Sequence, residues 1–173
     1  SDLKSTAAPS SEAANVAELM AVTKRLLDAV VAGDWNTYRE LVAADITCFE
    51  PEARGQLVEG LAFHEFYFKL PTDSVQPKKP VTTTLASPVV RMLSDTIGLV
   101  VYVRLTQTID GTGQPITRSC EETRLWKKQG SHWQHVHFHR SAPTHFEVFS
   151  LADCQCRQGN LSRWLEWQAN HFD

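Results

Sequence analysis

Residues 118–140 read RSCEETRLWKKQGSHWQHVHFHR, and this stretch decides the fold. Alternating polar and apolar residues on both sides of Lys128-Gln129-Gly130 predict a β-hairpin. We expect a three-residue loop closed by Gly130 in the left-handed conformation, which places Leu125 opposite Trp133 and Arg124 opposite Gln134. A two-residue loop would change the register and place Arg124 with the histidines.

The two faces of this hairpin differ in character. In the predicted register, one face carries Cys120, Glu122, Arg124, Trp126, Val136, Phe138 and Arg140. The opposite face carries Thr123, Leu125, Trp133, His135, His137 and His139, and we expect it to look outward, where subunits can meet. Arginines among apolar neighbours are costly to bury unless an anion meets them. The arginine face therefore indicates a binding pocket.

Composition limits the class of protein. The chain has 173 residues and a net charge of -3, which predicts one domain with a sizeable core. Basic residues are scattered, so we expect no nucleic-acid partner. No apolar stretch reaches membrane-spanning length, so we expect no membrane partner. No secretory signal is visible, and reduced cysteines in a cytoplasmic protein are expected.

The order of the predicted elements indicates an α+β domain. We expect a flexible linker over residues 1–14, a long helix over 15–32 and a short helix, N-capped by Asp34, that ends near 43. Short strands over 46–49 and 56–59 and an aromatic helix over 61–69 follow. Pro88, inside a long strand over 81–93, marks a bulge or a sheet edge. Further long strands over 96–109 and 115–127 lead into the hairpin, so a curved antiparallel sheet wraps around the first helix.

Three strands of this predicted sheet each carry one arginine among apolar residues, Arg104, Arg124 and Arg140. If the three side chains share the concave face, they converge on one pocket that suits a carboxylate or phosphate. A buried ion-pair network with Glu122, and with Glu50 or Glu52, is the structural alternative. The two interpretations are compatible because a ligand can displace internal acids.

Several motifs resemble one known family. FEPEARGQLVEG, AFHEFYF, VYVRLTQTIDGTGQP, SCEETRLW and HWQHVHFHRSAP are similar to the association, or hub, domain of calcium/calmodulin-dependent protein kinase II. The match runs from about residue 16 to 143, so the hub is expected over residues 15–143. The resemblance implies a cone-shaped fold similar to nuclear transport factor 2 and the ketosteroid isomerases. It also implies dimers stacked into double rings, usually of twelve or fourteen subunits.

The resemblance further implies a non-catalytic scaffold without cofactors. In the full kinase the hub gathers calmodulin-regulated kinase domains so that one subunit can phosphorylate its neighbour. The family's pocket residues fall on Arg104, Arg124, Arg140 and His64, beside Glu122, and in the family this pocket accepts small carboxylates or acidic regulatory-segment peptide. The partners implied are therefore copies of the chain itself, a fused kinase domain with its regulatory segment, and a small carboxylate.

The chain departs from the family pattern at two places. Glu65 stands where vertebrate hubs usually carry a basic residue, and residues 144–173 continue past the usual end. We expect a short amphipathic helix over about 160–172 in this extension. Neither kinase signatures nor a basic calmodulin-binding helix is visible in the sequence.

Two alternative functions are compatible with parts of the sequence. An isomerase or cyclase on the same fold would use Glu122 or His64 as its acid or base, but nearby arginines would keep Glu122 ionised and weakly basic. A metal site is conceivable at His135, His137 and His139, but adjacent rings on one extended strand splay too far apart, so a subunit contact is favoured there. The pair Cys154 and Cys156 lacks zinc-finger spacing, and no metal is expected.

Overall fold

The computed structural model describes residues 11–70, 80–142 and 144–145. Its elements are, in chain order, α1 (Ser11–Ala32), α2 (Trp35–Leu41), β1 (Val42–Phe49), η1 (Pro51–Ala53), β2 (Val58–Glu59), α3 (Ala62–Phe68), β3 (Thr82–Ser94), β4 (Ile97–Ile109), β5 (Pro115–Gln129), β6 (His132–Arg140) and β7 (Thr144–His145). The helix predicted over 160–172 lies outside the described residues. Because α1 begins at Ser11, the prediction of a linker up to residue 14 was wrong for residues 11–14.

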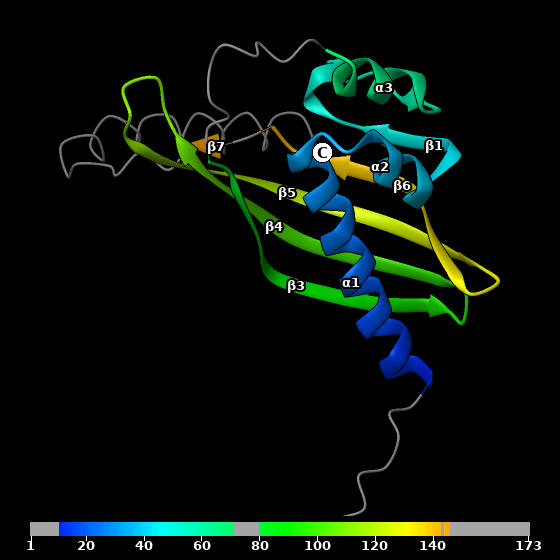
Figure 1. Ribbon diagram of the computed structural model, residues 1–173. Helices are drawn as coiled ribbons and strands as arrows, with labels where there is room; N and C mark the ends of the chain where they lie inside the picture. Colours follow the sequence, from blue (N-terminus) through cyan, green and yellow to red (C-terminus); the bar gives the residue numbers. More distant parts are fainter. Residues whose placement is uncertain (1–10, 71–79, 143, 146–173) are drawn as a thin grey trace, which may run out of the picture.

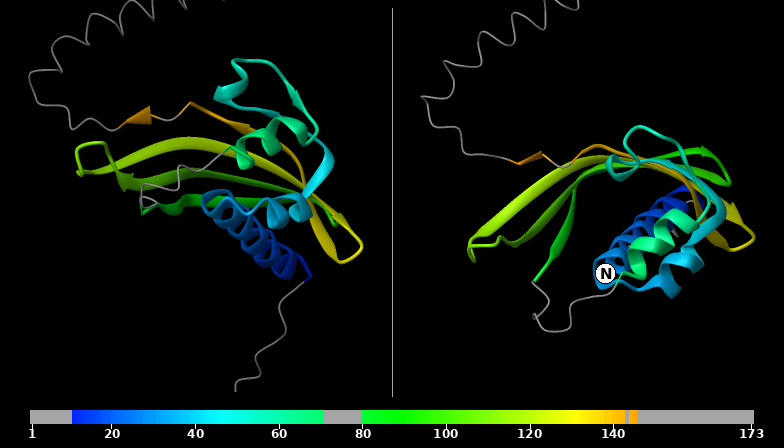
Figure 2. Two further views of the ribbon diagram at one scale, coloured as in Figure 1. Left: turned by 45° about the horizontal axis from the view of Figure 1, so that its top comes forward. Right: turned by 90° about the horizontal axis from the view of Figure 1, so that it is seen from above.

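The sheet has the strand order β2-β1-β6-β5-β4-β3, and β7 pairs with β5. Strands β1 and β6 run parallel, whereas the other pairs are antiparallel (Figure 1). The sheet curves strongly, and α1 lies on its concave side (Figure 2). This is the predicted α+β arrangement, with β3 to β6 forming an antiparallel meander.

Helix α1 packs closely against the sheet. Leu19, Leu26 and Leu27 on its inner side are fully buried, together with Trp126 of β5. The approach to β4 is tight at Gly98, where an added Cβ would clash with Leu19 Cδ1. A glycine at this position therefore sets how near α1 can come to the sheet.

The predicted hairpin register was wrong. Strand β5 continues to Gln129 and pairs it with His132, so the loop has two residues, and Gly130 has a φ of 60°. A register shift between Leu125 and Trp126 then changes the pairing, so that Arg124 lies opposite Phe138.

The same shift changes which β6 side chains face inward. Val136 lies in the bulge, so both His135 and Phe138 are buried on the concave side. Trp133 is also buried, and its Nε1 donates a hydrogen bond to Glu18 of α1 at 2.9 Å. The prediction that Trp133 and His135 look outward was therefore wrong, whereas His139 is exposed, as predicted.

The convex side of β3 and β4 is apolar. Val100 and Tyr102 of β4 point into the core. The intervening residues lie on the other side, where Leu99, Val101 and Val103 are half-buried and, on β3, Val89 and Leu93 are 46% and 60% exposed. We call these five residues the outer sheet face. Strand β3 is an edge strand in the described sheet, and its register shifts around Pro88, as predicted.

None of the helices in the described ranges combines the length and apolar character needed to cross a bilayer.

Candidate functional site

A cavity of about 300 Å³ lies on the concave side of the sheet, below α3. It brings together Arg104 of β4, Arg124 of β5, Arg140 of β6 and His64 of α3, which the sequence singled out. The remaining lining residues are Val30, Tyr38, Glu50, Glu52, Tyr67, Phe68 and Phe138. We call this cavity the arginine pocket. Glu122 completes the predicted set because it is buried beside these arginines.

Glu122 holds two of the arginines in place. Its Oε2 accepts hydrogen bonds from Arg124 Nη2 at 2.7 Å, from Arg124 Nε at 3.0 Å and from the Tyr102 hydroxyl. Its Oε1 lies 3.2 Å from Arg104 Nη1. Burial alone would raise the pKa of Glu122, but the arginine charges and the hydrogen bonds outweigh it and hold the pKa below its ordinary value. Glu122 is therefore an ionised anchor and a weak general base.

Arg124 is buried next to two rings, those of Phe138 and His135. Its guanidinium lies 4.9 Å from the centre of the Phe138 ring, and its Nη1 lies 3.3 Å from Nε2 of His135. Burial and the charge of Arg124 hold the pKa of His135 well below its ordinary value, so this ring is neutral and its Nε2 accepts the hydrogen bond. For Arg124 itself burial opposes the charged form, but Glu122 dominates and raises its pKa.

The third arginine, Arg140, pairs with two other glutamates. Arg140 Nη2 donates to Glu50 Oε2 at 2.9 Å and to Glu52 Oε2 at 2.6 Å. Burial would raise the pKa of Glu50, but His64 and Arg140 lower it below its ordinary value. The buried ion-pair network that the sequence suggested is thus present, and both Glu50 and Glu52 belong to it.

Sequence reasoning missed two members of the site. Tyr102 precedes Arg104 by two residues on β4, so strand alternation already placed both side chains on one face. Cys48 was taken as an ordinary strand residue, yet its Sγ lies 3.4 Å from His64 Nε2. That contact joins β1 to α3 and leaves no periodic signal in the sequence.

The histidine triplet on β6 is not a metal site. The bulge turns His135 into the core, whereas His137 and His139 lie on the opposite side of the sheet. His137 Nδ1 instead lies 2.7 Å from the Thr47 hydroxyl. One ion cannot reach all three rings, so this alternative is excluded.

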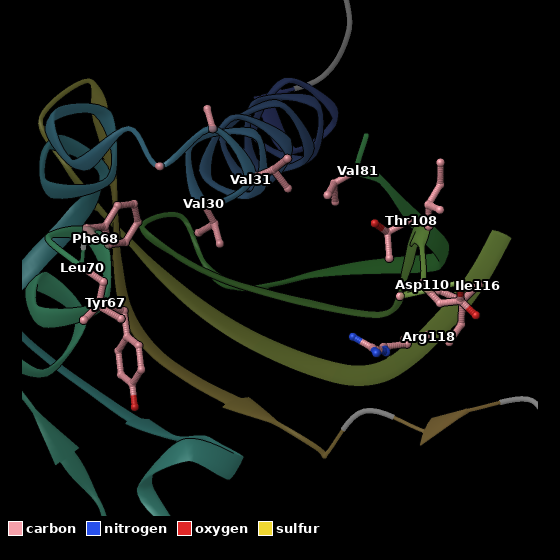
Figure 3. A pocket seen from close by; sticks show the side chains of 14 residues that line it. Val30, Val31, Tyr67, Phe68, Leu70, Val81, Thr108, Asp110, Ile116 and Arg118 are labelled. Carbon is pink, nitrogen blue, oxygen red and sulfur yellow. The ribbon is translucent and has the colours of Figure 1, made fainter. Parts of the chain in front are cut away.

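A second cavity of about 730 Å³ adjoins the arginine pocket and shares Val30, Tyr67 and Phe68 with it. Figure 3 shows that Val30 and Val31 of α1 line one side, and that Arg118 extends from β5 on another. Leu70 and Val81 also line it, and they flank residues 71–79, which are not described. We assign no ligand to this cavity.

The arginine pocket is balanced in charge when its residues are ionised. Arg104, Arg124 and Arg140 are matched by three acids, Glu50, Glu52 and Glu122. Arg104 Nε is buried without an acceptor among the described residues. The described pocket thus contains one guanidinium donor that no described residue uses.

This fold, a curved sheet with a long helix on its concave side, is that of the nuclear transport factor 2-like class. A protein of that class from Salmonella enterica superimposes with a TM-score of 0.58 at 20% identity, over 76% of this chain and 93% of that one. At this identity the likeness establishes the fold alone.

A match to a family model narrows the assignment within the nuclear transport factor 2-like class. The model of the calcium/calmodulin dependent protein kinase II association domain matches residues 15–144, and the chain belongs to this family. It is therefore a non-catalytic association domain.

Solved hub structures agree with this assignment. The calcium/calmodulin-dependent kinase II hub homology domain of Chlamydomonas reinhardtii is 47% identical with a TM-score of 0.70, over 73% of this chain and 97% of that one. The Caenorhabditis elegans association domain is 41% identical with a TM-score of 0.70, over 78% and 100%.

Full-length relatives are much longer than the chain. The delta subunit of the kinase from Oryctolagus cuniculus is 42% identical over 128 residues, which is 73% of this chain and 24% of the subunit. The chain thus spans about a quarter of the length of the curated relatives it matches.

Proposed function

We propose that the chain is a self-assembling hub that forms a closed homo-oligomer of dimers stacked into a double ring. Membership of the association-domain family supports this role. The single structural observation that carries it is the outer sheet face, where five apolar residues lie side by side on β3 and β4. A contiguous apolar patch on a folded domain is typical of an interaction surface.

A second copy of the chain is the occupant that this surface suits. Val89 pairs directly with Val101, and Leu99 lies opposite Arg91 on one side and Leu125 on the other. The patch thus extends along two neighbouring strands, and Arg91, which is exposed between Val89 and Leu93, is the charged residue within it. A two-fold symmetric dimer would bury the same patch on both partners.

The native mass of the assembly tests the proposal. Light scattering after size exclusion should give a multiple of the 19.5 kDa chain mass at micromolar concentration. Val101→Glu should shift the distribution to smaller species, because a buried carboxylate at a symmetric contact meets its own copy. Ala17→Glu adds the same charge at an exposed position of α1 and should leave the mass unchanged. A monomeric parent chain would overturn the proposal.

Where a kinase domain is fused upstream, we expect the hub to cluster kinase domains for phosphorylation between neighbours. The physical benefit is a local concentration in the millimolar range for domains on short flexible linkers, by the order of magnitude for tethered pairs. The relatives' length supports such a fusion, since about three quarters of each lies outside the matched region. Comparing the phosphorylation rate of the fusion with that of a Val101→Glu fusion, at equal kinase concentration, tests this step.

For the arginine pocket we propose a small carboxylate or an acidic peptide as ligand. Arg104 has an unused donor, and Glu52 is a replaceable partner of Arg140 because its side chain is 40% exposed. A bound carboxylate can take the place of Glu52 and reach Arg104, forming charge-assisted hydrogen bonds.

Thermal unfolding in the presence of acetate, butyrate or succinate tests the ligand. A carboxylate that binds should raise the melting temperature, and Arg104→Ala should remove the increase. Arg118→Ala is the matched control, because Arg118 lies in the adjoining cavity and should leave the increase intact. No shift with any carboxylate would favour a purely structural ion network.

A further inference from the structure

Three potential metal ligands converge at the edge of the arginine pocket. Cys48 lies near the end of β1, Glu50 directly follows that strand, and His64 lies on α3. One ligand atom from each, Sγ, a carboxylate oxygen and a ring nitrogen, lies within 4.8 Å of the other two. Cys48 is fully buried and the side chains of Glu50 and His64 are 9% and 7% exposed.

The spacing of these atoms fits one tetrahedral ion. Cys48 Sγ lies 3.4 Å from His64 Nε2, and His64 Nε2 lies 3.3 Å from Glu50 Oε1. Tetrahedral zinc with ordinary bond lengths separates a sulfur and a nitrogen ligand by about 3.5 Å, and a nitrogen and an oxygen ligand by about 3.4 Å. Both distances from His64 Nε2 thus match those between two ligands of one tetrahedral ion, and the third pair, Cys48 Sγ and a Glu50 oxygen, lies within 4.8 Å.

Surrounding residues fix the orientation of two ligands. The Arg140 guanidinium binds Oε2 of Glu50, which leaves Oε1 turned toward His64. The His64 ring packs edge-on against Tyr38 and is tilted against Phe138, with centroids 5.7 and 5.8 Å away. Such outer contacts preorganise a metal site because they hold the ligand atoms before the ion arrives.

We propose that Cys48, Glu50 and His64 form a binding site for a divalent ion of the zinc type, open on the side of the arginine pocket. A thiolate, an imidazole and a carboxylate are the donor set that zinc prefers. Glu50 and His64 line the pocket, so water or a carboxylate from the cavity would fill the fourth position. This site does not depend on the proposed assembly.

One proton leaves the site when the ion binds. Burial and the nearby Glu50 carboxylate raise the pKa of the Cys48 thiol to about 12, so the free thiol is protonated near neutral pH. The ion displaces that proton into solvent and binds the thiolate. The Cys48 thiolate and the Glu50 carboxylate then face the ion, while Glu52 remains paired with Arg140. Because Glu50 also pairs with Arg140, the site gains one positive charge, which a carboxylate in the fourth position would offset.

Cobalt(II) titration of the full chain tests the proposal. The protein carries no affinity tag, and Cys154 and Cys156 are replaced by serine in every sample, so that the remaining thiols are Cys48 and Cys120. We expect one cobalt ion per chain, a near-ultraviolet thiolate-to-cobalt absorption band, and visible bands of tetrahedral intensity. Zinc should displace the cobalt and remove these bands.

Variants assign the ligands. Cys48→Ser should abolish the thiolate band and weaken zinc binding by more than the roughly 10- to 100-fold that outer contacts contribute. Cys120→Ser removes the other buried thiol and should leave both unchanged. His64→Gln retains the thiol and should also weaken zinc binding, which covers the case in which Cys48→Ser does not fold. Absence of the thiolate band in the parent, or its persistence in Cys48→Ser, overturns the proposal.

Discussion

Replacing Glu122 by glutamine tests the central ion network of the pocket. The change keeps the size of the side chain and removes its charge. Arg124, 4% exposed, and Arg104 then share a buried environment without the anion that pairs both of them. The glutamine oxygen can accept one of the lost hydrogen bonds, but it cannot balance two cations.

The expected loss of stability is large. Removing one partner of a buried ion pair costs about 3–5 kcal/mol, because the remaining charge stays buried and unpaired. Here the lower end applies, since the Arg104 side chain is 17% exposed and retains some contact with water. We therefore expect Glu122→Gln to reduce the free energy of unfolding by about 3 kcal/mol at pH 7. That is a substantial part of the roughly 5–15 kcal/mol of a typical domain.

The pH dependence provides a second signature. The pKa of Glu122 is lower in the folded chain than in the unfolded chain, so its stabilising effect is fully present above the ordinary carboxyl pKa of about 4.3. The effect is lost as the pH falls through the lower, folded value. The difference in stability between the parent and Glu122→Gln should therefore be constant near pH 7 and shrink below about pH 4.

Urea unfolding at a fixed protein concentration measures both effects, since self-association would otherwise change the apparent stability. Glu59→Gln makes the same chemical change at an exposed position of β2 and should stay within about 0.5 kcal/mol of the parent. A Glu122→Gln variant as stable as this control, or one whose difference from the parent does not change with pH, would refute the reasoning.

Two further changes probe the packing and the buried imidazole. Gly98→Ala should cost about 1–3 kcal/mol in urea unfolding because the new methyl group meets Leu19, and Leu19→Ala should absorb part of that cost in a double-mutant cycle. The parent should lose stability as the pH falls from 6.5 to 5, by up to about 1.4 kcal/mol per pH unit from His135. The reason is that the pKa of His135 is depressed in the folded chain, so only the unfolded chain takes up the proton. His135→Gln should flatten that slope, and an unchanged slope would show that the ring is not the titrating group.

The β5–β6 hairpin shows where strand alternation predicts the buried face of a strand correctly and where it fails. Along β5 the alternation correctly placed Glu122 and Arg124 on the buried face, because no irregularity interrupts that strand before Leu125. Beyond the turn the prediction failed twice, once at the loop length and once at the bulge around Val136. The loop length had a local signal, because Gly130-Ser131 is a residue pair typical of two-residue hairpin turns. The bulge had none, and it becomes visible only where His135 is buried in the folded chain.

The part of the site that could be predicted from the sequence is the part in which the same residue type, arginine, recurs on neighbouring strands. Arginines at similar depth on β4, β5 and β6 indicated a common pocket, and His64 came from a resemblance of the surrounding motif. The contact of Cys48 with His64 was not predictable, because β1 and α3 meet only through the tertiary fold. A cysteine in a strand is ordinarily a small apolar residue, and only the position of a ring nitrogen beside it suggests another role.

The three acids of the arginine pocket differ in how easily an anion could replace them. Glu122 is fully buried, and its oxygens meet Arg104, Arg124 and Tyr102, so displacing it would strand several donors. Glu52 makes one short contact to Arg140 from an exposed position. An entering carboxylate should therefore exchange with Glu52 while Glu122 holds the scaffold. The net gain in binding free energy is the difference between the contacts of the carboxylate and those that Glu52 gives up. Glu52→Gln should therefore tighten carboxylate binding, whereas Glu122→Gln should release Arg104 and Arg124 from their fixed positions at the site.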